Sequence, residues 1–152
     1  MYTVVVKPGE SFGPINLGMT FEEVSKIFKY LPYSDSFIHL NYDDDGKLNE
    51  LEVANDRFIR PMLEEYDIYL FQTKVEELIP RLNPICSYAQ NELYVEGCQY
   101  DYTELGIRLW RNDDFYEKDL KDTKFSNLSA DEFSYWYDKL YFESLVIYKD
   151  DK

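Results

Sequence analysis

Two runs of alternating apolar residues around an Asp-rich turn restrict the fold of this chain more than any other feature. The runs are Phe37–Tyr42 and Lys47–Val53, and Asp43-Asp44-Asp45-Gly46 lies between them. Alternation with a period of two is typical of β-strands, and Asp-Gly between two such runs is typical of a hairpin. The apolar residues share one face if the pairs are Tyr42 with Lys47, Leu40 with Asn49, and Ile38 with Leu51. This register also places His39 opposite Glu50.

Three segments begin with a capping box, in which a Ser or Thr and a Glu three residues later bond each other's backbone N–H. The pairs are Thr20 with Glu23, Thr73 with Glu76, and Ser129 with Glu132. Apolar residues at helical spacing follow each box and predict helices over 21–31 and 75–82, and a short one through Tyr137. Pro80 lies inside the second helix and predicts a kink or an early end there.

Further segments rich in apolar and β-branched residues predict strands over 2–7, 68–71, 92–96, 99–103, 106–111 and 141–149. Residues 113–124 are charged and are expected to form a solvated loop. The length of 152 residues fits one domain over 1–152. We therefore expect an α+β fold, with an antiparallel sheet that carries two or three helices on one face.

Residues 12–56 and 66–149 share weak similarities that suggest a duplicated strand-helix-hairpin unit. Ile38-His39-Leu40 corresponds to Ile107-Arg108-Leu109, and the first two helical stripes correspond to each other. The second hairpin would then contain an insertion between Asn112 and Leu140. The alternative is chance, because any α+β chain shows such similarities.

The charge balance restricts the partners. Thirty acidic residues against 16 basic residues give a formal charge of −14, which disfavours nucleic acid and anionic lipid and favours a basic protein partner. We find neither a signal peptide nor an apolar run approaching the ~20 residues of a membrane span. We therefore expect a cytoplasmic protein with no membrane association. The alternative is that the acidic surface only aids solubility.

Catalytic residue types are few. The chain has one histidine, His39, and two cysteines, Cys86 and Cys98, which we expect to be reduced and structural. The segment Asn41–Glu52 resembles a calcium-binding EF-hand loop in its acidic residues, its glycine and its closing Glu52, but its flanks favour a hairpin over a calcium site. We find no phosphate-binding loop or metal motif. We therefore expect no enzymatic activity, no cofactor and no metal site.

The best candidates for partner contact are acidic residues with neighbouring tyrosines, since tyrosine is a frequent interface anchor. They are Tyr42, Asp43, Asp44, Asp45, Glu50, Glu52, Asp113, Asp114 and Tyr116. Most lie at two predicted hairpin tips. The oligomeric state is left open.

The segment from Gly13 to Val24 has the pattern G-x-I-x-L-G-M-T-x-x-E-V, and Tyr42-Asp43-Asp44-Asp45-Gly46 has the pattern Y-D-x-D-G. In these motifs the chain resembles a group of small bacterial α+β proteins, some of which are similar to immunity proteins that neutralise toxins used between bacteria. The resemblance does not cover residues 57–65 and 85–99. It implies an immunity protein that blocks the active site of a cognate toxin, with a basic nuclease as the favoured toxin. The alternatives are a structural or regulatory adaptor and a DNA-mimic anti-defence protein.

Overall fold

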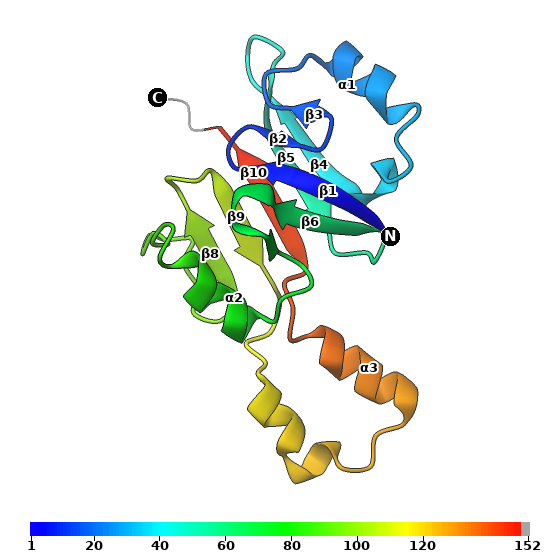
Figure 1. Cartoon of the computed structure of the whole chain (residues 1–152), viewed down its shortest axis with the longest axis vertical. Helices are drawn as coiled ribbons and strands as arrows, with labels where there is room; N and C mark the ends of the chain where they lie inside the picture. Colours follow the sequence, from blue (N-terminus) through cyan, green and yellow to red (C-terminus); the bar gives the residue numbers. More distant parts are fainter. Residues whose placement is uncertain (150–152) are drawn as a thin grey trace.

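Over residues 1–149, the part of the chain that the computed structural model describes, two five-stranded sheets and three α-helices form an α+β fold, as expected (Figure 1). The first sheet has the order β3-β2-β1-β6-β7, with bounds β1 (Tyr2–Lys7), β2 (Ser11–Phe12), β3 (Ile15–Asn16), β6 (Ile59–Leu63) and β7 (Ile68–Tyr69). The second has the order β4-β5-β10-β9-β8, with bounds β4 (Phe37–Tyr42), β5 (Leu48–Ala54), β8 (Gln99–Tyr102), β9 (Ile107–Trp110) and β10 (Ser144–Tyr148). The α-helices are α1 (Phe21–Phe28), α2 (Val75–Leu82) and α3 (Ala130–Asp138). Short 3₁₀ helices span Ser34–Ser36, Glu64–Tyr66, Glu117–Lys121 and Thr123–Phe125.

The two sheets lie face to face and bury a common core (Figure 1). The first sheet turns alternate residues of β1 and β6 inward: Val4, Val6, Ile59 and Leu63. The second sheet contributes one alternating face: Leu51, Val53, Ile107, Leu109, Leu145 and Ile147. Helix α2 adds Val75, Leu78 and Leu82, and α1 adds Val24. Helix α3 buries no residue, so of the helices expected on one face only α1 and α2 contribute to the core.

The expectation of one antiparallel sheet is wrong, because the strands divide between two sheets and β1 runs parallel to β6. Strand β6 lies in residues 57–65, for which no strand was predicted. Its middle residue is Pro61, which lacks a backbone donor and is therefore rare inside sheets. Here Pro61 is buried, and its carbonyl accepts the N–H of Leu70 at 2.9 Å.

Two of the three predicted capping boxes are confirmed. The Thr20 hydroxyl accepts the N–H of Glu23 at 3.2 Å, and Glu23 accepts the N–H of Thr20 at 3.1 Å. Ser129 and Glu132 make the same two bonds before α3. The box at Thr73 is wrong: its hydroxyl donates to the carbonyl of Tyr69 at 2.6 Å, and α2 begins without a side-chain cap.

The β4–β5 hairpin is present, but the predicted register is wrong. The observed pairs include Leu40 with Leu51, Asn41 with Glu50, and Tyr42 with Leu48. Irregularities at both ends of β4, between Phe37 and His39 and between Asn41 and Tyr42, shift the pairing. A bulge sets two residues against one, so simple alternation gave the wrong partners and Ile38 is exposed rather than inside.

The second half of the chain differs from expectation in two ways. Residues 92–96 form turns rather than a strand, with one isolated bridge from Val95 to Gln99. The duplication is not confirmed: β9 and β10 do pair around an insertion that holds α3, but β8 extends the sheet beyond β9 and no strand among residues 1–149 occupies the matching place beside β4.

Gly106, between β8 and β9, lies against Gly9 of the β1–β2 turn. Its φ is +69°, and a Cβ atom there would lie 2.6 Å from the Tyr148 carbonyl oxygen and 2.8 Å from the Cα of Gly9. Gly46 has a similar φ of +75° but no heavy atom within 4 Å of such a Cβ. We expect Gly46→Ala to lower the free energy of unfolding by about 1 kcal/mol, because its backbone is left-handed. Gly106→Ala should lower it by about 1–3 kcal/mol more through overpacking. Urea unfolding measures both, and equal losses would contradict the close approach.

Tyr102 is fully buried, and its hydroxyl has no hydrogen-bond partner among residues 1–149. Burial raises the pKa of its phenol, so the folded state resists ionisation while the unfolded chain ionises near pH 10. Ionisation of this phenol therefore leaves the folding stability unchanged below pH ~10 and lowers it as pH rises above that value, because the unfolded chain loses the proton first. We expect Tyr102→Phe to be neutral or stabilising by about 1 kcal/mol at pH 7 and to flatten the alkaline loss. Tyr30→Phe, at an exposed position, should change neither the stability at pH 7 nor its loss at alkaline pH. Chemical unfolding from pH 7 to 11 measures both.

Candidate functional site

The predicted contact residues at the two acidic tips lie at opposite ends of the second sheet. Asp43, Asp44 and Asp45 precede β5, whereas Asp113 and Asp114 follow β9, which runs parallel to β5 on the other side of β10. At ~3.3 Å per residue, the seven residues of β5 separate these ends by about 20 Å. One compact contact patch therefore does not include both acidic ends.

At the β4–β5 end, part of the predicted set is used by the turn itself. One carboxylate oxygen of Asp43 accepts the N–H groups of Asp45 and Lys47, at 2.9 and 3.0 Å. The ring of Tyr42 packs against Phe21 of α1, at 6.0 Å between centroids, and is half-buried. Asp44 and Asp45 are exposed. The segment that resembled a calcium loop is thus a strand-turn-strand unit without the flanking helices of an EF-hand.

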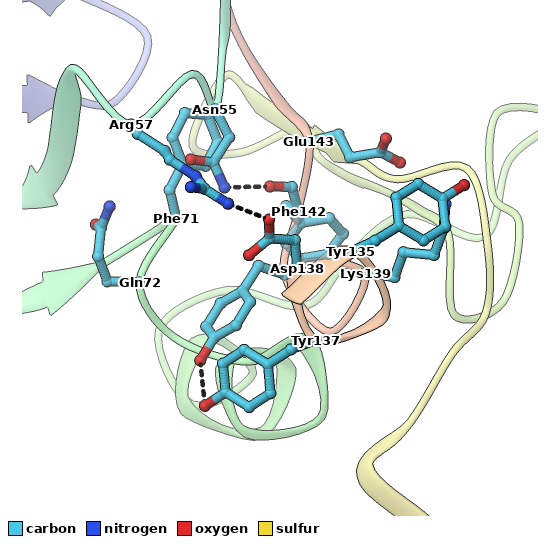
Figure 2. A pocket seen from close by; sticks show the side chains of 11 residues that line it. Asn55, Arg57, Phe71, Gln72, Tyr135, Tyr137, Asp138, Lys139, Phe142 and Glu143 are labelled. Carbon is cyan, nitrogen blue, oxygen red and sulfur yellow. Dashed lines mark hydrogen bonds and ion pairs between the residues drawn. The ribbon is translucent and has the colours of Figure 1, made fainter. Parts of the chain in front are cut away.

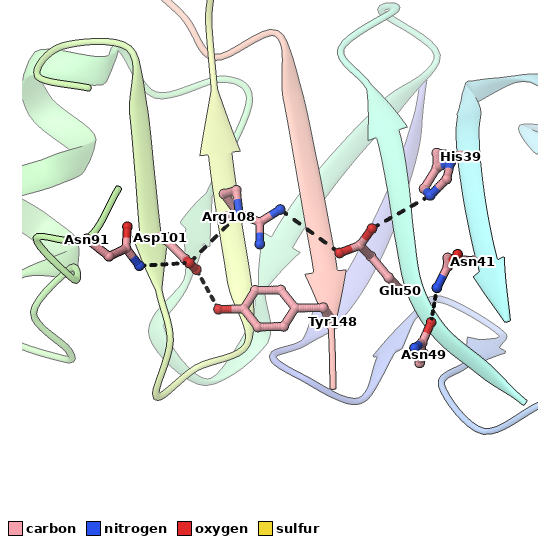
Figure 3. Close-up of polar contacts among 8 residues, drawn as sticks. All are labelled: His39, Asn41, Asn49, Glu50, Asn91, Asp101, Arg108 and Tyr148. Carbon is pink, nitrogen blue, oxygen red and sulfur yellow. Dashed lines mark hydrogen bonds and ion pairs between the residues drawn. The ribbon is translucent and has the colours of Figure 1, made fainter. Parts of the chain in front are cut away.

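Glu50 lies in a chain of polar contacts across the outer face of the second sheet (Figure 3). Its carboxylate lies 3.7 Å from His39 and 4.0 Å from Arg108. The guanidinium of Arg108 also lies 3.9 Å from Asp101 and covers the ring of Tyr148, whose hydroxyl donates to Asp101. Arg108 is thus shared between the carboxylates of Glu50 and Asp101.

Glu52 lies two residues after Glu50 on β5 and therefore on the same face of the sheet. It is half-buried and pairs with Val146 on one side and His39 on the other. No ion pair joins it to a basic residue within residues 1–149. Of the two predicted glutamates, Glu52 therefore carries the uncompensated charge.

The predicted insertion forms an arm, residues 112–140, that projects from the double sheet (Figure 1). Its own small core consists of Phe115, Phe125 and Trp136, with ring centroids 5.1–5.7 Å apart. On α3, Phe133 and Tyr135 remain exposed, although they are large and aromatic. The arm also contains 3₁₀ helices where the sequence predicted only a solvated loop.

Arg111 fastens the arm to the body. Its side chain is 1 % exposed, and its guanidinium donates to three backbone carbonyls: Gly97 at 2.6 Å, Phe115 at 2.7 Å and Lys139 at 2.9 Å. Phe115 and Lys139 belong to the two opposite stems of the arm. The ring of the predicted contact residue Tyr116 lies 5.2 Å from the guanidinium, so Tyr116 helps to hold this junction.

Ion pairs flank the junction. Lys139 binds Asp113 at 2.8 Å within the arm, and Lys74 binds Glu117 at 3.2 Å between the body and the arm. The hydrogen bonds to these carboxylates raise the pKa values of both lysines. Asp113 is therefore compensated internally, whereas Asp114 is exposed.

A cavity of about 420 Å³ lies where the C-terminal end of α3 meets the body (Figure 2). Five of its lining residues are aromatic and four are charged. The lining residues are Asn55, Arg57, Phe71, Gln72, Tyr135, Tyr137, Asp138, Lys139, Tyr141, Phe142 and Glu143. Arg57 reaches from the β5–β6 loop to Asp138 and forms an ion pair across the mouth.

The cysteines show no nucleophile arrangement. Cys86 lies near Glu104, at 3.8 Å, and Cys98 lies near the carbonyl of Asn112, at 3.9 Å. Burial raises the pKa of both thiols, which lowers the fraction of reactive thiolate. The ion-pair partner of His39 is Glu50 rather than a thiol.

Arg111, Arg57 and the cavity were not among the features predicted from the sequence. Arg111 is the last residue of the predicted strand 106–111, and arginine is rarely buried. The cavity gathers segments that are up to 88 positions apart, from Asn55 to Glu143. The aromatic residues of the predicted short helix through Tyr137 were the one feature of the sequence that pointed to this region.

Comparisons with known proteins give no family. No family model, no curated protein and no solved structure matches the chain. Within residues 1–149, no helix has the length and apolar character needed to cross a membrane.

Arg111 can be tested by substitution. We expect Arg111→Ala to cost about 3–5 kcal/mol of stability, because it leaves three carbonyls unpaired and a large cavity. Arg111→Lys keeps the charge but lacks the several planar N–H donors of a guanidinium, and it should lower the stability by about half as much. Urea unfolding and limited proteolysis measure the two effects, and new cleavage should be confined to 112–140. Arg81→Ala on the exposed side of α2 is the control. Unchanged proteolysis in Arg111→Ala would contradict the fastening role.

Proposed function

We propose that the chain is a binding protein without enzymatic activity that inhibits a basic protein partner. In functional terms it is an immunity protein that neutralises a cognate bacterial toxin, with a basic nuclease as the favoured toxin. Inhibition occurs by occlusion of the toxin's active site with an acidic surface.

The observation that carries this proposal is the uncompensated negative charge. Of the 28 Asp and Glu residues within residues 1–149, five take part in an ion pair with a basic residue of this part of the chain. They are Glu50, Asp101, Asp113, Glu117 and Asp138. The other carboxylates add to a field that attracts a basic surface and accelerates association with it.

The arm adds exposed aromatic side chains to the acidic surface. Binding energy at interfaces is concentrated in a few buried aromatic anchors. Helix α3 presents the exposed Phe133 and Tyr135, and the same arm carries the exposed Asp131 and Asp114. At the opposite end of the sheet, Tyr42 packs under α1 and leaves the exposed Asp44 and Asp45 without an aromatic anchor. We therefore assign the main contact to the arm and long-range steering to the β4–β5 turn.

The test is protection of cells. Co-expression with the C-terminal domain of the secreted toxin encoded directly upstream should restore growth, and the chain should bind an inactivated form of that domain. A pair of charge reversals on the arm, Asp114→Lys with Asp131→Lys, should weaken binding about ten-fold or more. The matched pair Asp44→Lys with Asp45→Lys changes net charge equally and should mainly slow association.

Three outcomes would contradict the proposal. Absence of protection despite normal expression would remove the immunity function, and binding without protection would favour an adaptor. Competition with DNA for an unrelated basic protein, with a steep dependence on salt, would favour a DNA mimic.

A further inference from the structure

The cavity at the base of the arm has two carboxylates in its lining, Asp138 and Glu143, beside two cations, Arg57 and Lys139. Asp138 ends α3, and a helix C-terminus carries partial negative charge that favours a cation. Glu143 lies on the same lining. Phe71 and Phe142 form the apolar wall, and both are buried.

Tyrosine rings complete the cavity. Tyr135, Tyr137 and Tyr141 belong to its lining, and the hydroxyl groups of Tyr137 and Tyr141 lie 3.2 Å apart in a hydrogen bond (Figure 2). Aromatic faces attract cations, most strongly where water is partly excluded. A volume of about 420 Å³ lies within the range of small-ligand sites. A planar, aromatic-stacking cation fits this combination best, and among side chains that is arginine.

The protein already places a guanidinium at this site. Arg57 pairs with Asp138 across the mouth of the cavity, while 73 % of the Arg57 side chain and 53 % of the Asp138 side chain remain exposed. Exposed pairs of this kind contribute little net stability. Arg57 has a φ of +73°, which non-glycine residues rarely adopt. The pair is therefore easily exchanged for a better partner.

The other charges of the lining are engaged elsewhere. Lys139 binds Asp113 and lies 4.8 Å from the centre of the Tyr135 ring. Glu143 accepts the backbone N–H of Asn112. Asp138 is thus the carboxylate that an incoming cation can take over, with Arg57 as its sole ion-pair competitor within residues 1–149.

We propose that this cavity binds an arginine side chain of the partner protein, and that Arg57 occupies the carboxylate of Asp138 until that arginine displaces it. The proposal rests on the proposed function only in taking the partner to be basic. It predicts that the arm contributes one specific pocket for an anchor side chain in addition to its acidic surface.

The full chain can be titrated with a blocked tripeptide that has arginine between two glycines, followed by NMR of the tyrosine rings and backbone amides. We expect shifts at Tyr135, Tyr137 and Tyr141. The same peptide with citrulline, which keeps the shape but lacks the charge, should bind much more weakly. Arg57→Gln should tighten arginine binding up to about five-fold, and Asp138→Asn should weaken it about ten-fold or more.

Two further variants separate direct from indirect effects. Asp44→Asn removes the same charge at the far end of the sheet and should leave binding unchanged. The double variant of Arg57→Gln with Asp138→Asn should bind as weakly as Asp138→Asn alone. Equal effects of Asp44→Asn and Asp138→Asn, or equal binding of the citrulline peptide, would overturn the proposal. Because the probe is a peptide, this result does not depend on toxin protection, and either proposal can fail while the other stands.

Discussion

A buried guanidinium determines how the parts of this molecule fit together. Arg111 is surrounded by protein and faces carbonyl oxygens rather than a carboxylate. A buried charge without hydrogen bonds is costly, so the backbone must bring carbonyls to it. Those carbonyls come from the loop before β8 and from both stems of the arm. The same requirement therefore sets where the arm begins, where it ends, and how it leaves the sheet.

The strong negative charge of the chain is compatible with this fold because the charge stays outside. The inward faces of the two sheets and of α2 are apolar, and the buried acid Asp101 is held by Tyr148 and Arg108. The remaining carboxylates within residues 1–149 are exposed or half-buried and are spread over many elements, so water reduces the repulsion between them. The uncompensated charge thus costs the fold little and remains available to a partner.

Local features of the fold were predictable, and long-range features were not. The boxes at Thr20 and Ser129 depend on four consecutive residues and were found correctly. The box at Thr73 failed because Tyr69, outside those four residues, offered a better acceptor. Strand β6 was missed because burial between β1 and β7 overrides the preference of Pro61. Of the proposed contact residues, Tyr42 and Tyr116 were chosen as exposed anchors, but α1 and Arg111 partly cover them.

The arm separates function from folding. Its attachment depends on main-chain carbonyls, which any sequence supplies, together with one arginine that belongs to the body. Its outer side chains, such as Phe133 and Tyr135, are exposed and lie outside the hydrophobic core, so they can change without loss of the fold. The cavity beneath the arm has one wall from each part, Phe71 from the body and Tyr137 from α3. Binding of a partner side chain there would depend on the position of the arm as well as on its surface. Because Arg111 holds the arm in place, recognition would also depend on its guanidinium.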